Sequence, residues 1–279
     1  MELAAPAFEI LTVKSGAKTL RCLQRKETFH PGIGPLEEAN ILHVEQQRIV
    51  ARAQAAGRLV LWDVGLGAAA NVIAVMNALS LAGHAAEIEI HSFDISTAPL
   101  EFALGQLDSL TYLAPYASAV QSLVREGQVQ VAPKISWHFH AGDFRQELAK
   151  PGIPKPQGIL YDPYSPNTNR DMWTLGHFSR LHAQLEGECL LTNYTRSTAV
   201  RVTWLLAGFY VGIGAIIGEK AETSVAATTF RAIERPLDKI WLERVKISRN
   251  GAPIRGEQKG DVPISETDYA RLLAHPQFA

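Results

Sequence analysis

The sequence has few cysteines, almost no net charge and no long uninterrupted apolar run. The two cysteines, Cys22 and Cys189, lie far apart and form no metal-ligand spacing, which favours reduced thiols over a disulfide framework or a zinc site. The most apolar segment, 204–218, is interrupted by four glycines and is shorter than the roughly 20 residues needed to cross a bilayer. These absences favour a cytoplasmic protein with no membrane span.

The formal net charge of −1 lacks the overall electrostatic signature of a nucleic-acid-binding protein. Any RNA partner would therefore need a local basic surface. Hydrophobic residues make up 47% of the 279 residues and charged residues 20%, which is typical of a globular protein with a large core. The segment Met1–Pro6 has neither a positively charged start nor an apolar centre, so no signal peptide is expected.

One stretch combines the pattern of a buried strand with a glycine turn. The apolar run 59–64 contains Asp63 and is followed by Gly65 and Gly67, after which small residues begin a helical pattern. Glycines at such a turn let the backbone approach a nucleotide-type ligand. The dinucleotide-binding motif would place a third glycine where this chain has Ala70, so S-adenosylmethionine is favoured over a dinucleotide. An ordinary strand-to-helix turn remains the alternative.

Strands and helices alternate after residue 57 and predict an open α/β sheet. Further strands are expected at 87–93, 135–139, 158–161 and 189–193, with a closing hairpin at 209–217 and 223–230. Together with the strand before Gly65, they predict a mostly parallel seven-stranded sheet with helices on both faces.

Three segments are expected along the chain. Residues 1–57 should form an N-terminal hairpin, a Pro/Gly-rich loop and a helix, and residues 58–230 the cofactor-binding core. Residues 231–279 should form a C-terminal extension.

Acidic residues follow three of the predicted strands. Asp94 ends the second strand, Asp143 follows the third through Gly142, and Asp162 follows the fourth. Because the carboxyl ends of parallel strands meet at one edge of a sheet, ligands bind there. Asp94 is in position to accept from a ribose diol, and Asp143 from an adenine amino group. Taken singly, each acid is also a candidate for capping a turn or a helix.

The stretch from Asp162 to Asn167, Asp-Pro-Tyr-Ser-Pro-Asn, is the candidate acceptor site. Its two prolines stiffen a loop that holds an acid, an aromatic face and a hydroxyl. The carboxylate of Asp162 can accept from an amine while the ring of Tyr164 faces a sulfonium or a developing cation. Positioning should therefore dominate catalysis, without a strong general base. A proline-rich turn with a capping acid and a surface tyrosine is the alternative.

Glu37 and Glu38 begin a helix after a loop rich in glycine and proline. Acids are favoured there by the helix dipole, but one of the two can point into the cleft toward the ammonium group of the cofactor. His138 and His140 share a face of the third strand and have no partner at metal-ligand spacing, so no metal site is expected.

Several motifs, taken in order, resemble the methyltransferase half of MnmC, the bifunctional enzyme that modifies the wobble uridine of tRNA. They are Leu36-Glu37-Glu38, Val64-Gly65-Leu66-Gly67 with Asn71, Ser92-Phe93-Asp94, Gly142-Asp143, Asp162 with Pro166, Asn169-Arg170-Asp171-Met172-Trp173-Thr174, Ala207-Gly208-Phe209 and Gly218-Glu219-Lys220. The resemblance spans roughly residues 27–230. Its Leu-Glu-Glu and Asp-Met-Trp-Thr runs are more specific than the glycine turn.

The resemblance implies a class I, Rossmann-like methyltransferase that uses S-adenosyl-L-methionine. It implies conversion of 5-aminomethyl(-2-thio)uridine to 5-methylaminomethyl(-2-thio)uridine at position 34 of tRNA, so the anticodon of tRNA is the expected partner. In that family the acid matched by Asp162 lies between cofactor and substrate. Patterns and resemblance together predict Asp162 and Tyr164 as catalytic residues.

The same reasoning predicts the remaining site residues. Cofactor contacts are expected from Glu37, Glu38, Gly65, Leu66, Gly67, Asn71, Asp94, Ile95, Gly142, Asp143, Phe144 and Asp162. Substrate contacts are expected from Pro163, Tyr164, Ser165, Pro166 and Asn167.

The chain departs from the family pattern in ways that bear on its acceptor. It has Asp-Pro-Tyr-Ser-Pro where the family usually has Asp-Gly-Phe-Ala-Pro, Gly-Leu-Gly-Ala-Ala where Gly-Phe-Gly-Thr-Gly is normal, and Asp94 in place of a glutamate. No second nucleotide motif corresponds to the family's flavin oxidase half, so only methyl transfer is expected, and a separate partner would make the aminomethyl precursor. Two other functions stay open: methylation of a small-molecule amine, and non-catalytic binding of S-adenosylmethionine or RNA.

Overall fold

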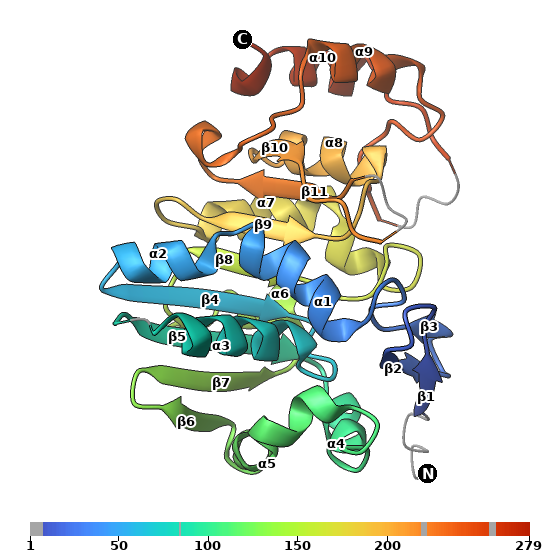
Figure 1. Ribbon diagram of the computed structural model, residues 1–279. Coiled ribbons are helices and arrows are strands. Elements are labelled where there is room, and N and C mark those ends of the chain that lie inside the picture. Colours follow the sequence, from blue (N-terminus) through green and yellow to red (C-terminus); the bar gives the residue numbers. More distant parts are fainter. Residues whose placement is uncertain (1–7, 84, 219–221, 257–260) are drawn as a thin grey trace.

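The computed structural model describes residues 8–83, 85–218, 222–256 and 261–279 (Figure 1). Met1–Pro6, and Glu219 and Lys220 of the resemblance, lie outside the described residues. The strands form a three-stranded sheet in the order β1-β2-β3 and an eight-stranded sheet in the order β10-β11-β9-β8-β4-β5-β7-β6. Within the ranges described, none of the helices combines the length and the apolar character needed to cross a membrane.

The centre of the large sheet is parallel. It consists of β4 (Arg58–Val64), β5 (Glu87–Asp94), β7 (Ile135–Ala141), β8 (Gly158–Tyr161) and β9 (Leu190–Asn193). Strand β4 pairs with both β5 and β8, so the glycine turn at its end lies in the middle of the sheet. Its residues are apolar toward both faces, as expected of a strand covered by helices on two sides.

The two edges of the sheet are antiparallel. Strand β11 (Ser224–Ala227) pairs antiparallel with β9 and with β10 (Tyr210–Ile213), which confirms the closing hairpin. The α/β class is as predicted, but the sheet has eight strands rather than seven, because β6 (Gln128–Ala132) pairs antiparallel with β7. The sequence of β6, Gln-Val-Gln-Val-Ala, is too short and polar to stand out, and pairing with β7 supplies its stability.

Helices cover both faces, and each face has its own hydrophobic cluster. One face carries α1 (Pro35–Ala39), the π-helical η1 (Asn40–Glu45), α2 (Ile49–Ala55), α3 (Ala70–Ala82), α4 (Ala98–Leu104), the 3-10 turn η2 (Thr111–Tyr116) and α5 (Ala117–Glu126). The other carries α6 (Phe144–Glu147), the 3-10 turn η3 (Arg170–Trp173), α7 (Leu175–Gln184) and α8 (Thr198–Leu206). The single helix expected at the end of residues 1–57 is broken, because Arg48 has a positive φ of 50°.

The N-terminal sheet consists of β1 (Phe8–Thr12), β2 (Lys18–Cys22) and β3 (Glu27–Thr28). In Figure 1 it lies on the side toward which the arrowheads of β4 and β7 point. It therefore faces the edge where ligands bind in parallel sheets.

The C-terminal residues form η4 (Phe230–Ala232), α9 (Lys239–Ile247), α10 (Glu266–Leu273) and η5 (Pro276–Phe278). Figure 1 shows α9 and α10 beyond α8, at the end of the molecule opposite β6. Gln277 ties the extension to β10, since its Oε1 accepts from the Val211 N–H at 2.7 Å. The apolar side chains of the C-terminal extension join the same hydrophobic cluster as those of α7 and α8.

Candidate active site

A cavity of about 650 Å³ lies at the carboxyl ends of β4, β5, β7 and β8, a volume typical of small-molecule sites. Residues 24–31 and Glu38 close it from the N-terminal side. The predicted residues that line it are Glu38, Gly65, Leu66, Gly67, Asp94, Ile95, Gly142, Asp143, Phe144, Asp162, Pro163, Tyr164 and Ser165. The structure thus brings together most of the predicted site from positions far apart in the chain.

Four predicted residues, Glu37, Asn71, Pro166 and Asn167, do not line the cavity. Glu37 is exposed and lines a separate groove beside α3. Its neighbour Glu38 turns inward, is only 3% exposed and accepts from the Gly32 N–H through Oε2 at 3.3 Å, because successive helix residues point about 100° apart. Pro166 and Asn167 follow Ser165 in the chain and are not among the residues that line the cavity.

Asn71 is near the cavity without lining it. Its side chain is buried in the first turn of α3, and Nδ2 donates to Asp162 Oδ2 at 3.4 Å. Asn71 therefore contacts the candidate acceptor loop rather than the cavity itself.

The glycine turn is shaped by the close approach of two loops. Gly65 has a φ of +94°, and a Cβ built there would lie 2.5 Å from the Asp162 carbonyl oxygen and 3.0 Å from the Pro163 Cα. A Cβ on Gly67 would lie 3.0 Å from the ring of Phe29. The backbone of the neighbouring loop therefore requires glycine at position 65, independently of any ligand, and the Phe29 ring disfavours a side chain at position 67.

Asp94 is held by backbone N–H groups at the end of β5. Oδ2 accepts from the Gly67 N–H at 3.2 Å, and Oδ1 accepts from the Ile95 N–H at 2.8 Å. Burial raises the pKa of Asp94, and hydrogen bonds from backbone N–H groups oppose that shift. The carboxylate lies beside the glycine turn, where the strand order predicts it.

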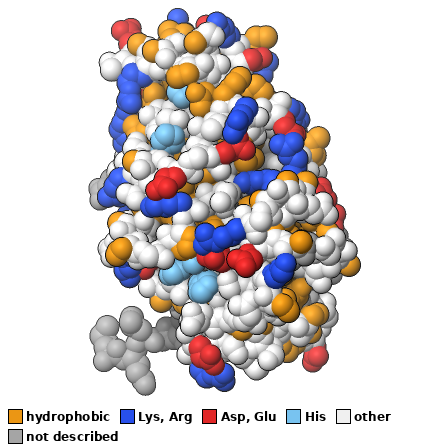
Figure 2. All heavy atoms as spheres, turned by 90° about the vertical axis from the view of Figure 1, so that its left-hand side faces the viewer, with side chains coloured by type: hydrophobic (Ala, Val, Ile, Leu, Met, Phe, Trp, Pro, Cys, Tyr) orange, Lys and Arg blue, Asp and Glu red, His pale blue; other side chains and the backbone are white. Residues whose placement is uncertain are grey.

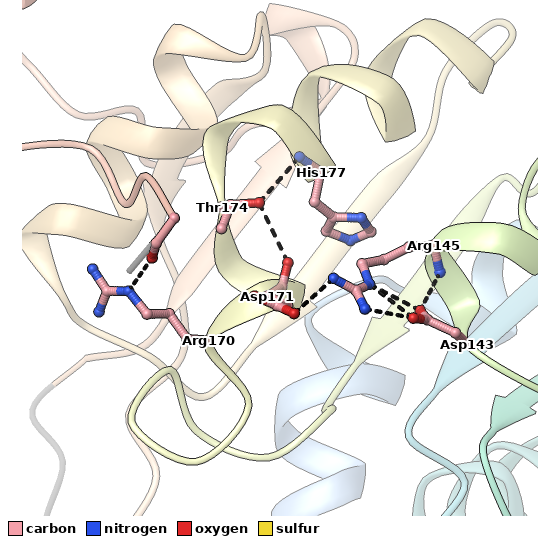
Figure 3. A network of polar contacts seen from close by, with 7 residues as sticks. Asp143, Arg145, Arg170, Asp171, Thr174 and His177 are labelled. Carbon is pink, nitrogen blue, oxygen red and sulfur yellow. Dashed lines mark hydrogen bonds and ion pairs between the residues drawn. The ribbon is translucent and has the colours of Figure 1, made fainter. Parts of the chain in front are cut away.

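Asp143 is paired with Arg145 in the wall of the cavity (Figure 3). Oδ1 accepts from the Arg145 backbone N–H at 2.9 Å and so caps α6, and Oδ2 accepts from Arg145 Nη2 at 2.5 Å. Hydrogen bonding from Arg145 is the main cause that lowers the pKa of Asp143. The pair, which the sequence patterns do not reveal, occupies much of the acceptor capacity that an adenine contact would use.

The candidate acceptor loop is held from two sides. The Ser165 backbone N–H donates to Glu27 Oε1 at 2.7 Å, and its hydroxyl donates to Oε2 at 3.0 Å. Trp173 Nε1 donates to the Tyr164 carbonyl oxygen at 3.1 Å. Tyr164 has a φ of +47°, a conformation that non-glycine residues rarely adopt. Contacts from β3 and η3 hold the loop in this shape.

The side chains of Asp162 and Tyr164 offer different chemistry. The carboxylate of Asp162 lies 3.8 Å from His30 Nε2. The Tyr164 ring packs edge-on against Phe29, with centroids 5.5 Å apart, and the Arg25 guanidinium lies 6.0 Å from its centroid. Burial, followed by the neighbouring Cys22, raises the pKa of the Tyr164 hydroxyl above its ordinary value. That hydroxyl stays protonated near neutral pH and cannot serve as a base.

A family model described as S-adenosyl-L-methionine-dependent methyltransferase matches residues 111–229. The match includes Asp143 and the loop after Asp162, and it begins after the glycine turn. The chain contains an S-adenosyl-L-methionine-dependent methyltransferase domain. None of the curated proteins matches its sequence.

A solved structure agrees with this chain in fold. The crystal structure of MnmC2 from Aquifex aeolicus is similar with a TM-score of 0.74 and 23% identity, over 96% of this chain and 85% of that chain. At this level of identity the likeness establishes the class I methyltransferase fold. The O-methyltransferase TomG from Streptomyces achromogenes, solved in complex with S-adenosylmethionine, matches with a TM-score of 0.37 and 11% identity, over 66% of this chain and 78% of that chain.

The cavity of the methyltransferase domain suits S-adenosylmethionine chemically. Carboxylates of Glu38, Asp94, Asp143 and Asp162 line it, and the cofactor carries an ammonium, a sulfonium and ribose hydroxyls that such acceptors recognise. Apolar side chains of Leu66, Phe93, Ile95, Phe144 and Met172 line the same cavity and match the flat adenine ring.

Several cavity residues of the methyltransferase domain escaped the sequence predictions. Phe29 and His30 line the cavity from the Pro/Gly-rich loop, where no periodic pattern exists. Met172 lies in the Asp-Met-Trp-Thr run, so the resemblance contained a signal for it. Tyr194 follows β9 directly, and the rule that singled out the acids at strand ends would have found it.

His138 and His140 share a face of β7 and both stack on His91, with ring centroids 4.8 and 5.2 Å apart. Among the residues whose placement is described, no group of three or more His, Cys, Asp or Glu is arranged to hold a metal ion.

Proposed function

We propose that this methyltransferase transfers a methyl group from S-adenosylmethionine to the nitrogen of the 5-aminomethyl group of uridine 34 in tRNA. The position of Asp162 carries the proposal, because this residue lines the cavity and its backbone packs directly against the glycine turn. The ring pair of Phe29 and Tyr164 lines the same cavity. An acid and aromatic faces next to a methyl-donor site suit an amine nucleophile. The motif resemblance and the MnmC2 likeness over most of both chains support this acceptor.

In this proposal the cofactor is held along the strand ends. The backbone of Gly65, Leu66 and Gly67 would approach it, Asp94 would accept from its ribose hydroxyls, and Glu38 would face its ammonium group. The adenine contacts are assigned to Ile95, Gly142, Asp143 and Phe144. When bound, S-adenosylmethionine supplies an electrophilic methyl group on a sulfonium centre.

Asp162 orients the acceptor. An oxygen of its carboxylate accepts an N–H of the amine and so aims the nitrogen lone pair. The amine has to lose its extra proton to solvent before it reacts, because only a neutral nitrogen has a free lone pair. Tyr164 contributes its ring, and its protonated hydroxyl takes no part in proton transfer. Alignment therefore supplies most of the rate enhancement.

The rim of the cavity has the basic side chains that a tRNA phosphate would need. Arg25 and Lys26 line the cavity and are exposed. By contrast, the face drawn in Figure 2, on the left of Figure 1, has acidic and basic side chains interspersed. A local basic rim on a chain of nearly zero net charge favours an RNA acceptor over a small-molecule amine.

Nucleoside analysis tests the proposal. In a deletion strain, mass spectrometry of tRNA should show loss of the methylaminomethyl nucleoside and accumulation of the aminomethyl nucleoside. The wild-type gene should restore the modification, and the Asp162→Ala variant should not. An unchanged level of the methylaminomethyl nucleoside in the deletion strain would refute the proposed acceptor.

A second assay separates the three functions. Purified protein is given methyl-labelled S-adenosylmethionine with either aminomethyl-containing tRNA or the free aminomethyl nucleoside. The double variant Arg25→Ala, Lys26→Ala should have a higher KM for tRNA. The slope of log affinity against log salt concentration should also become shallower by about one unit for each lost phosphate contact. Equal activity on the nucleoside supports the small-amine alternative, and labelling of neither supports a non-catalytic protein.

The proposal has two consequences in the cell. The enzyme acts in the cytoplasm, where its tRNA substrate is found. A separate activity has to generate the 5-aminomethyl group, because methyl transfer alone cannot produce it.

A further inference from the structure

The C-terminal extension reaches the active site through two backbone carbonyl groups. The Ile254 carbonyl oxygen accepts from the Leu175 N–H at 2.8 Å. The Gly256 carbonyl oxygen accepts from Arg170 Nε at 2.7 Å. Arg170 is the first residue of η3, and Leu175 begins α7 just after that turn. The extension therefore holds both ends of the turn.

The 3-10 turn η3 also contacts two parts of the cavity wall, the Arg145–Asp143 pair and the loop of Tyr164. Asp171 Oδ2 lies 2.9 Å from Arg145 Nη1, and Arg145 is bonded to Asp143 in the wall (Figure 3). Trp173 Nε1 donates to the Tyr164 carbonyl oxygen at 3.1 Å. A displacement of η3 would therefore disturb the proposed adenine side and the proposed acceptor side together.

Residues 254–256 are anchored by an ion pair. Arg255 Nη1 and Nη2 each lie 2.7 Å from an oxygen of Asp268 in α10. Asp268 is 5% exposed and is also hydrogen-bonded by the Ser265 hydroxyl at 3.2 Å. A bidentate arginine–carboxylate pair fixes orientation as well as distance. The backbone of this segment is held further where the Ile254 N–H donates to Thr203 Oγ1 at 2.8 Å.

We propose that Arg255 is a positioning residue of the methyltransferase. Its ion pair with Asp268 fixes the carbonyl groups on either side of it, these hold η3, and η3 aligns the Arg145–Asp143 pair and the backbone of Tyr164. This role rests on the proposed cofactor site but not on the identity of the acceptor. The C-terminal extension is in this way part of the active-site scaffold.

The first test compares two arginines that face the same carboxylate. Arg271 Nη1 lies 3.5 Å from Asp268 Oδ1 but is outside the segment that bonds to Arg170 and Leu175. Arg255→Ala should raise the Kd for S-adenosylmethionine, measured by calorimetry, by about 3- to 30-fold, and Arg255→Lys should recover part of the affinity. Arg271→Ala should change the Kd less than twofold.

Hydrogen exchange of the free protein gives a readout that does not depend on activity. The peptide covering residues 170–176 should exchange faster in Arg255→Ala than in Arg271→Ala, because the Leu175 N–H loses its fixed acceptor. If Arg255→Ala does not fold, Arg170→Ala, which removes the bond to Gly256, should produce the same rise in Kd.

A double-mutant cycle separates the positioning role from a purely structural one. If Arg255 acts through η3, combining Arg255→Ala with Asp171→Asn should raise the Kd little more than the larger single effect. The inference is overturned if the Kd increases of the two single variants multiply in the double variant. It is also overturned if Arg255→Ala lowers Tm but has the same Kd and the same hydrogen-exchange rates as Arg271→Ala. Failure of tRNA methylation alone would refute the proposed acceptor and leave these measurements interpretable.

Discussion

Replacing Gly65 by alanine should show how tightly the glycine turn and the acceptor loop are packed. A left-handed backbone costs a non-glycine residue about 1–2 kcal/mol. The added Cβ would also lie 2.5 Å from the Asp162 carbonyl oxygen, and forcing such a contact apart costs roughly 1–3 kcal/mol more. Gly65→Ala should therefore lose about 2–5 kcal/mol of unfolding free energy. It should also bind S-adenosylmethionine more weakly, because the displaced loop carries the Asp162 carboxylate.

Gly152 offers a matched control for this experiment. Its φ of +91° is close to the +94° of Gly65, and nothing lies within 4 Å of a Cβ built on it. Gly152→Ala should lose only about 1–2 kcal/mol and keep its affinity for S-adenosylmethionine. Urea unfolding gives the free energies and calorimetric titration gives the affinities. The reasoning is refuted if the two variants lose equal stability, or if Gly65→Ala binds the cofactor like the wild type.

Three further substitutions test the assigned roles. Asp162→Ala should lower turnover about 10²-fold with Tm nearly unchanged, and near-normal turnover would contradict the placement of the acceptor. Tyr164→Phe should keep turnover within a few-fold and leave the pH–rate profile unaltered, because burial raises the pKa of the hydroxyl and keeps it protonated; a loss as large as that of Asp162→Ala would contradict this. Burial raises the pKa of Asp63 from 3.8 to about 7, so the stability due to its bound proton is present below pH 3.8 and is lost as pH rises through about 7. The unfolding free energy of Asp63→Asn, measured in urea relative to that of the wild type, should therefore be higher at pH 8 than at pH 4. An equal difference between variant and wild type at both pH values would count against the shifted pKa.

The arrangement of the strand ends followed well from the sequence. Gly65, Asp94, Asp143 and Asp162 line one cavity, because parallel strands with helical crossovers bring their carboxyl ends to the same edge. The helix before β4 was harder to predict. Arg48 breaks it with a positive φ. Only the packed structure shows that Glu38, and not Glu37, lines the cavity.

The sequence by itself determined the local chemistry of this protein: the apolar central strands, the glycine turn after the first of them, and the acids that follow the strands. Local spacing is sufficient for these features, because each depends on neighbours within a few residues. Only the tertiary structure decided that Gly65 packs against the Asp162 backbone and that Gly256 accepts from Arg170. These contacts join segments distant in the chain, and the folding of the sheet and the packing of the C-terminal extension bring them together.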